Sequence, residues 1–274
     1  MKRKARDVTE TINIWSGETA LYEKTRPHAP NILLDICSQL IHVPEPSVVV
    51  DLGSGTGFST VLWAQRARQI IGIEPNREMR IQAERLLSLS SHGERIQYLD
   101  GLSTQTGLVS SSVDIVTCSQ SLHWMEPEPT FAEVARILRP GGLFVAYDYD
   151  WPPTVHWEVE QAYHNVIARF RRIRAERAID RGVKSWPKEE HLTRMQESGQ
   201  FCYVKELVVH QTEEGNAERF IGLTLSYGIA RYLKQGYLTE QEVGLDHLKR
   251  IAHDFIGPES IPWYFSYRIR VGIK

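Results

Sequence analysis

A glycine-rich loop that follows an apolar run constrains the fold of this chain most strongly. Residues 48–50 are three valines, Asp51 comes next, and Gly53, Gly55 and Gly57 stand at alternate positions. This pattern is typical of a buried strand that breaks into a tight loop and opens a helix. Because glycine has no Cβ atom, the backbone of such a loop can approach a ligand closely. The segment therefore predicts a ligand site at the end of a strand.

Further apolar runs alternate with amphipathic segments as far as residue 150. Strands are expected at 47–51, 69–74, 95–100, 113–119 and 142–150, and helices at 58–68, 76–88 and 128–138. Nearly continuous apolar strands that alternate with helices are typical of a parallel sheet covered on both faces. Right-handed crossovers then give a doubly wound, Rossmann-like α/β fold with a mostly parallel sheet.

The segments on either side of this core are expected to complete the sheet and cover its end. The predicted division is a helical cap at 1–46, a core at 47–150, a helical insertion at 151–187 and a completion of the sheet at 188–274 that carries a second helical insertion at 216–255. Residues 202–210 and 263–273 alternate in character, which indicates an antiparallel hairpin. We expect the helical insertions to form a lid.

Composition excludes several classes of protein. Among 274 residues the formal net charge is −2, which argues against a general nucleic-acid surface. The three cysteines are far apart and lack metal-site or disulfide spacing, so we expect no metal and a cytoplasmic location. No stretch approaches the ~18 apolar residues of a membrane span, and the basic start is not followed by the apolar segment of a secretion signal.

The order of the glycines selects among nucleotide ligands. A dinucleotide fingerprint needs its third glycine three positions after the second, where this chain has Phe58, and no phosphate-loop Gly-Lys-Ser/Thr follows. Asp51 would also sit awkwardly beside a pyrophosphate. An acid at this position suits S-adenosylmethionine, which carries an ammonium and a sulfonium and no phosphate.

Two further acids at expected strand ends suit an adenosine. Glu74 ends the second expected strand, where a carboxylate can accept hydrogen bonds from both ribose hydroxyls, a feature that NAD enzymes share. Asp100 ends the third, where it can accept from the adenine amino group. Gly101 follows, and Leu102 can pack on the ring.

Taken together, these segments resemble a known family. "VVVDLGSGTG", "IGIEP", "YLDGLS", "VDIVTCSQSLHWM" and "ILRPGGLFVAYD" match, in order, the motifs of class I S-adenosylmethionine-dependent methyltransferases over about residues 45–150. "LYEKTRP" and "SLHWM" are similar to the small-molecule group that includes trans-aconitate and malonyl-acyl-carrier-protein methyltransferases. The resemblance implies a transferase that uses S-adenosyl-L-methionine.

The resemblance also implies cofactor contacts. The expected cofactor residues are Asp51, Gly53 and Gly55 with Ser119 or Gln120 at the methionine half, Glu74 with Pro75 of the same motif at the ribose, and Asp100, Gly101 and Leu102 at the adenine. Tyr22 and Arg26 are expected to close over the cofactor, with Arg26 on the methionine carboxylate. The alternative is that both anchor the amino-terminal helix.

The acceptor side is less specific. His123, after the fourth strand, is the candidate base for an amine or phenol, although it could simply pack beside Trp124. Asp148 and Asp150, interleaved with Tyr149, could bind a cationic acceptor or be ordinary loop acids. The inserted helices offer aromatic residues for an acceptor pocket, among them Tyr227, and these could equally be core residues.

A basic helix gives a further acceptor candidate. Residues 169–181 contain six arginines, of which Arg174 and Arg177 border the apolar stripe and could clamp an anionic acceptor. The alternatives are a solvated face or an RNA contact. The sequence thus predicts a methyltransferase that acts on an O or N atom of a small molecule, with a carboxylate as one candidate acceptor. RNA or protein methylation is the alternative, followed by an NAD-linked oxidoreductase or a cofactor-binding protein without catalysis.

Overall fold

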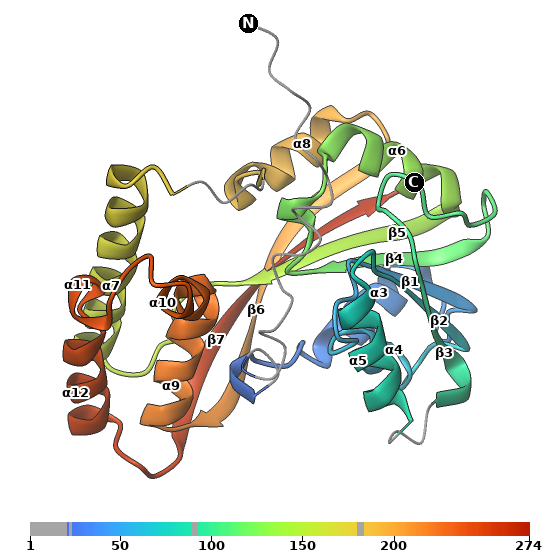
Figure 1. Cartoon of the computed structure of the whole chain (residues 1–274). Coiled ribbons are helices and arrows are strands. Elements are labelled where there is room, and N and C mark those ends of the chain that lie inside the picture. Colours follow the sequence, from blue (N-terminus) through green and yellow to red (C-terminus); the bar gives the residue numbers. More distant parts are fainter. Residues whose placement is uncertain (1–20, 22–23, 89–92, 180–183) are drawn as a thin grey trace, which may run out of the picture.

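The computed structural model describes residue 21 and residues 24–88, 93–179 and 184–274. Its centre is a seven-stranded sheet with the order β3-β2-β1-β4-β5-β7-β6 (Figure 1). The strands are β1 Val48–Leu52, β2 Gln69–Ile73, β3 Ile96–Leu99, β4 Val113–Ser119, β5 Leu138–Tyr149, β6 Tyr203–Gly215 and β7 Ile261–Ile273. The first five are parallel, and β7 pairs antiparallel with both β5 and β6. The predicted Rossmann-like sheet with a terminal hairpin is confirmed.

The helices of the core cover both faces of the sheet. They are α3 Ile32–Ile41, α4 Thr60–Trp63, α5 Arg77–Leu87, α6 Pro127–Ile137 and α8 His191–Glu197. Leu33 and Trp63 pack with Val49 on one face, and Phe131 and Met195 pack with alternate core residues on the other. This division follows from the period of two in the buried strands, which sends successive side chains to opposite faces.

One expected helix is shorter than its pattern suggested. The segment 58–68 contains only one short α-helix, α4, and then continues in turns closed by bonds such as Arg66 N to Trp63 O. Ser59 and Thr60 direct their hydroxyls to Asp51, so the start of this segment serves the loop before it.

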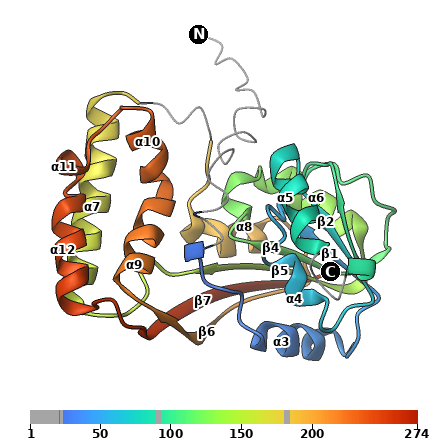
Figure 2. The ribbon, with the colours of Figure 1, turned by 60° about the horizontal axis from the view of Figure 1, so that its bottom comes forward.

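A second group of helices stands at the far end of β6 and β7. It comprises α7 Trp157–Glu176, α9 Ala217–Thr224, a π-helix η5 at Leu225–Ile229, α10 Ala230–Lys234, α11 Glu240–Val243 and α12 Leu245–Phe255. Figure 2 shows these helices grouped at the end of the long hairpin, across the molecule from α4 and α5. We name this group the lid helices.

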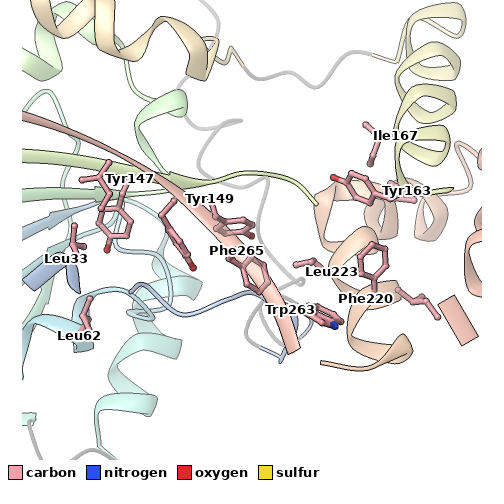
Figure 3. Packing of buried hydrophobic residues seen from close by; sticks show 14 of the residues in the cluster. Leu33, Leu62, Tyr147, Tyr149, Tyr163, Ile167, Phe220, Leu223, Trp263 and Phe265 are labelled. Atoms are coloured by element: carbon pink, nitrogen blue, oxygen red, sulfur yellow. The ribbon is translucent and has the colours of Figure 1, made fainter. Parts of the chain in front are cut away.

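The core continues into the lid helices without a break. Phe220 of α9 meets Trp263 of β7 edge to face at 5.7 Å between centroids, and Tyr163 of α7 meets Phe220 at 6.2 Å. Figure 3 shows this row of aromatic side chains running from the sheet to the helices. The lid helices are therefore packed on the hairpin through a shared apolar core. Within the described residues, no helix is both long and apolar enough to cross a membrane.

Candidate functional site

A large cleft lies over the carboxyl ends of the parallel strands. It encloses about 2180 Å³ and reaches from the loop after β1 to the lid helices α7, η5 and α10. In this topology the chain leaves β1 and β4 in opposite directions, and ligands of open α/β sheets bind at such a switch point. The position of the cleft is therefore the one that the glycine loop predicted.

The glycine loop can adopt its shape only with glycines. Gly53, Gly55 and Gly57 have φ values of 66°, 57° and 82°. A Cβ on Gly57 would lie 2.1 Å from Tyr98 Oη, and one on Gly53 would lie 2.8 Å from Ser121 Cβ. At Gly55 the nearest heavy atom to a Cβ would be Met79 Sδ at 3.7 Å, so the backbone there has open space beside it. Gly53 and Gly55 line the cleft.

Asp51 supports this loop from beneath and does not line the cleft. Its side chain is fully buried, and Oδ2 accepts hydrogen bonds from Ser59 Oγ and Thr60 Oγ1, both at 2.7 Å. Burial raises the pKa of Asp51 to about 6, against the lowering effect of the two hydroxyls. The expected contact of Asp51 with the methionine half stays a prediction: Oδ2 turns toward the start of α4, while Oδ1 has no hydrogen-bond partner among the described residues.

Glu74 joins the loop to the next helix and lines the cleft. Its Oε2 accepts from Gly55 N at 3.0 Å and its Oε1 from Asn76 N at 2.8 Å. Burial raises the pKa of Glu74, although both hydrogen bonds favour the ionised form. Each carboxylate oxygen has a second lone pair, so the group can also accept from ligand hydroxyls. Pro75 lies in the cleft wall beside it.

The adenine residues divide into two groups. Gly101 and Leu102 line the cleft, and the Leu102 side chain is 36% exposed, which leaves an apolar surface for a flat ring. Asp100 is exposed and does not line the cleft; its Oδ1 accepts from Arg80 Nη1 at 3.2 Å. The adenine contact expected of Asp100 stays a prediction; in this structure the carboxylate pairs with an arginine of α5.

The end of β4 brings Ser119 and Gln120 into the cleft. Gln120 has a left-handed φ of 52°, and its N–H donates to Tyr147 O of the neighbouring strand at 3.0 Å. Its Oε1 accepts from Lys188 Nζ at 2.7 Å. Lys188 was not among the residues expected from sequence, since a lysine in "WPKEE" near a helix start carries no signal of a site.

His123 lies in a short 3₁₀ turn, η3 Leu122–Trp124, and lines the cleft. Burial, followed by the positive charge of Lys188, holds the pKa of His123 well below its usual value, so the imidazole is neutral near pH 7. Its Nδ1 is buried and has no hydrogen-bond partner among the described residues. The centroid of the His123 ring lies 4.6 Å from that of Trp124, so His123 both packs against Trp124 and lines the cleft.

Asp148 and Asp150 already form ion pairs with cationic side chains. Lys188 Nζ lies 2.6 Å from Asp148 Oδ1 and Arg270 Nη1 lies 3.2 Å from Oδ2, while Arg268 Nε lies 2.9 Å from Asp150 Oδ1. Burial is the largest single influence and opposes the ionisation of Asp148, but Lys188, His123 and His191 together outweigh it and hold the pKa below its usual value. Because both acids have internal partners, neither offers free charge to a cationic acceptor.

Arg26 connects three parts of the cleft wall. Its Nε donates to Ser226 Oγ at 3.0 Å, Nη2 to Ser226 O at 2.8 Å and Nη1 to Tyr149 Oη at 2.6 Å. The guanidinium also lies 4.4 Å from the centroid of Trp151. Such bonds are of the kind expected if Arg26 anchors the amino-terminal segment to the rest of the fold. Arg26 also lines the cleft. Tyr22 lies outside the described residues.

The arginines of α7 are arranged differently from the predicted clamp. Arg174 and Arg177 do not line the cleft. Arg174 lies over the rings of Phe170 and Tyr232, and Arg177 donates to Tyr237 O and pairs with Glu242. Arg171 of α7, which was not among the expected residues, lines the cleft together with the expected Tyr227.

Comparison with known proteins agrees with this geometry. Residues 50–146 match the family described as a methyltransferase domain. An uncharacterized methyltransferase-like protein of Schizosaccharomyces pombe is 28% identical over 162 residues, which cover 59% of this chain and 60% of that protein. A provisionally named S-adenosylmethionine-dependent methyltransferase of Saccharomyces cerevisiae is 29% identical over 139 residues, or 50% and 47% of the two chains.

The fold as a whole has a solved counterpart. A structure provisionally named a type II methyltransferase, from Anaeromyxobacter dehalogenans, superposes with a TM-score of 0.62 over 90% of this chain and 97% of that one, at 22% identity. The two yeast relatives are matched over about half to three fifths of their length. The chain therefore spans less than two thirds of the length of these two relatives.

Proposed function

We propose that this chain, which carries a class I S-adenosylmethionine-dependent methyltransferase domain over residues 50–146, transfers a methyl group to an oxygen or nitrogen atom of a small molecule. One observation carries the proposal. The cleft that begins at the glycine loop continues between the sheet and the lid helices, so cofactor and acceptor would share one enclosed space. A small molecule fits such a space better than a folded macromolecule does.

The residues at the cofactor end fit S-adenosylmethionine. We assign Gly53 and Gly55 to the methionine half, Glu74 to the ribose hydroxyls, and Gly101 and Leu102 to the adenine. The support is the open backbone beside Gly55, the remaining lone pairs of Glu74 and the exposed apolar face of Leu102. When bound, this cofactor supplies a methyl group that is activated by its positively charged sulfur.

At the acceptor end, His123 would take the proton that an amine, alcohol or phenol must lose. A neutral imidazole is needed for this, and burial keeps His123 neutral. Gln120 and Ser119 would hold the two reactants in line, since positioning accounts for much of the rate in a displacement of this kind. In this assignment residues 47–150 bind the cofactor, while 151–187 and 216–255 enclose the acceptor.

An RNA or protein substrate has less support. The alternative of an RNA or protein substrate rested on the arginine-rich helix. In the structure, Arg172 pairs with Glu176 and Arg177 pairs with Glu242, so much of the positive charge of that helix is neutralised within the chain. Arg171 faces the cleft and not the outer surface of α7. These contacts leave a weak basic patch, and a phosphate backbone requires a stronger one.

The test is to incubate the purified chain with methyl-labelled S-adenosylmethionine and a cell extract, and then to separate metabolites, RNA and protein. We expect the label in one or a few small molecules. Label confined to RNA or protein would contradict the small-molecule acceptor, while protection against thermal unfolding by S-adenosylhomocysteine, and not by NADH, would verify the cofactor independently.

A further inference from the structure

We infer that the acceptor carries a carboxylate on a flat, largely apolar body, and that the Arg171–Tyr227 pair binds this carboxylate. The inference rests on the proposed function, because it names the class of acceptor for the same cleft. It concerns the wall formed by the lid helices, to which no residue of the methyltransferase domain match belongs.

Arg171 offers a positive charge that the fold does not use. Within residues 24–88, 93–179 and 184–274 its guanidinium forms no ion pair, and its Nη2 donates a hydrogen bond to Tyr227 Oη at 2.6 Å. That hydrogen bond, and to a lesser degree the more distant charge of Glu189, raises the pKa of Arg171, so the group stays charged. Both Arg171 and Tyr227 line the cleft.

Tyr227 adds a second donor. Because its oxygen accepts from Arg171, its own O–H is left to donate in another direction. A guanidinium N–H and a phenol O–H that converge on one point suit a carboxylate, which accepts from both. Tyr227 lies in η5, where the helical backbone is interrupted by a kink at Gly228. Gly228 beside it has a φ of 106° and open space where a Cβ would be.

The lid wall of the cleft favours negative charge along its length. Its lining residues are Tyr163, His164, Ile167 and Arg171 of α7, Leu225, Ser226, Tyr227 and Gly228 of η5, and Arg231 and Tyr232 of α10. None of these described residues is an aspartate or glutamate. The carboxylates that line the cleft belong to other elements, and several already have cationic partners, as for Asp148 and Asp150.

Aromatic rings next to this pair define the body of the ligand. Trp151 and Tyr163 are stacked with centroids 6.3 Å apart and planes 14° apart, and Tyr227 meets Trp151 edge to face at 5.9 Å. All three line the cleft. Such a surface accommodates a planar unsaturated group by stacking. The carboxylate would thus serve as the handle at the lid, and the reacting atom would lie toward His123 and Gln120.

The test compares carboxylic acids with their neutral amides. Binding of benzoate, cinnamate and indole-3-acetate, and of the three corresponding amides, is measured by ligand-observed NMR on the full chain. The proteins are the wild type, Arg171→Met, Tyr227→Phe and the control Arg172→Met, whose exposed side chain pairs with Glu176. We expect at least one acid to bind the wild type about tenfold more tightly than its amide.

This preference should vanish in Arg171→Met, weaken in Tyr227→Phe and persist in Arg172→Met. Circular dichroism checks that each variant is folded, and Tyr227→Phe keeps the ring packing if Arg171→Met is unstable. Failure of every acid to exceed its amide, or a preference that survives in both cleft variants, overturns the inference. Calorimetry with S-adenosylhomocysteine on the same preparations tests the cofactor site separately, so loss of the proposed function would be distinguished from loss of the carboxylate site.

Discussion

The ammonium of Lys188 donates a hydrogen bond to Gln120 Oε1 at 2.7 Å, across 68 positions of the chain. The same nitrogen lies 2.6 Å from Asp148 Oδ1. Lys188 therefore links the segment after α7 to the ends of β4 and β5, at the part of the cleft where we place the cofactor's methionine half. Through this contact, the lid side of the chain can influence how firmly Gln120 is held.

Replacement of Lys188 by Met should weaken binding of S-adenosylhomocysteine about three- to tenfold, because Gln120 loses its partner. It should also lower the free energy of unfolding by about 1–3 kcal/mol, since a buried acid loses one of its two cations. Calorimetry and urea denaturation measure the two effects. Lys205→Met, at an exposed position in β6, is the matched control, and equal behaviour of both variants would contradict the linking role.

Replacement of Glu74 by Ala should weaken binding of S-adenosylhomocysteine about tenfold or more, since hydrogen bonds to a charged group contribute ~1.5–3 kcal/mol each. The side chain also holds Gly55 N and Asn76 N, so Glu74→Gln should retain part of the loop order and lose less affinity. Glu78→Ala, exposed on α5, is the control in the same calorimetric titration. Unchanged affinity in Glu74→Ala would remove this residue from the site.

Replacement of His123 by Ala should lower kcat about 10²- to 10⁴-fold, as loss of a general base does, while the affinity for S-adenosylhomocysteine stays within about twofold. Because burial keeps the imidazole neutral, the wild-type rate should stay level from pH 8 to pH 6 and fall only below that range. The measurement uses the acceptor identified by labelling. Full activity in the variant would show that the acceptor needs no base.

Replacement of Gly57 by Ala should destabilise the chain strongly, because a Cβ would lie 2.1 Å from Tyr98 Oη at a φ of 82°. Gly107→Ala separates the two causes, since Gly107 has a φ of 74° and nothing within 4 Å of a Cβ. The control should cost about 1–2 kcal/mol from the left-handed backbone alone. Gly57→Ala should cost about 1–3 kcal/mol more from overpacking, as read from urea denaturation. Equal costs would show that Tyr98 moves aside freely.

The free energy of unfolding should fall as the pH falls from 6.5 to about 4, in part through His191. Burial lowers the pKa of this residue to about 4, and its Nε2 has no hydrogen-bond partner among the described residues. An unfolded histidine takes up a proton near pH 6.5, so the unfolded state binds more protons in this window and gains stability by up to about 1.4 kcal/mol per pH unit.

The variant His191→Gln isolates this contribution. It should show a flatter pH dependence of urea stability between pH 4 and 6.5 than the wild type. Asp51, whose raised pKa acts in the opposite direction over part of this range, is present in both proteins and cancels in the comparison. A slope identical to that of the wild type would mean that His191 is protonated as easily in the folded state as in the unfolded chain.

The glycine loop and the strand ends could be predicted because their signals are local. Three left-handed glycines after an apolar strand have few alternative structures. Glu74 comes directly after its strand, whichever neighbours that strand pairs with. Asp51 was correctly expected near the loop, but its orientation could not be predicted. Two hydroxyls eight and nine residues later draw its carboxylate inward, and only the fold of that turn brings them close.

The lid shows the opposite case. Arg171, Arg174 and Arg177 have the same chemistry and lie on or at the end of one helix. Periodicity alone pointed to Arg174 and Arg177, whereas Arg171 is the one that lines the cleft. Which arginine faces the cleft depends on the rotation of α7 against α12 and η5. That rotation is set by packing between helices distant in sequence. The same holds for Lys188, which meets Gln120 because the chain after α7 returns to the end of β4.

By itself the sequence determined the order of strands and helices, the glycine loop and the cofactor class, because each depends on residues within about one turn or one strand of each other. Tertiary structure alone decided which charges are neutralised inside the fold and which remain for a ligand. Asp148 of β5 meets Arg270 of β7, which lies 122 residues further along the chain. Arg171 instead meets a tyrosine and, among the described residues, forms no ion pair with an acid. Charge recognition in the acceptor site is a property of these long-range contacts, since pairing energy depends on distance and burial in the folded chain.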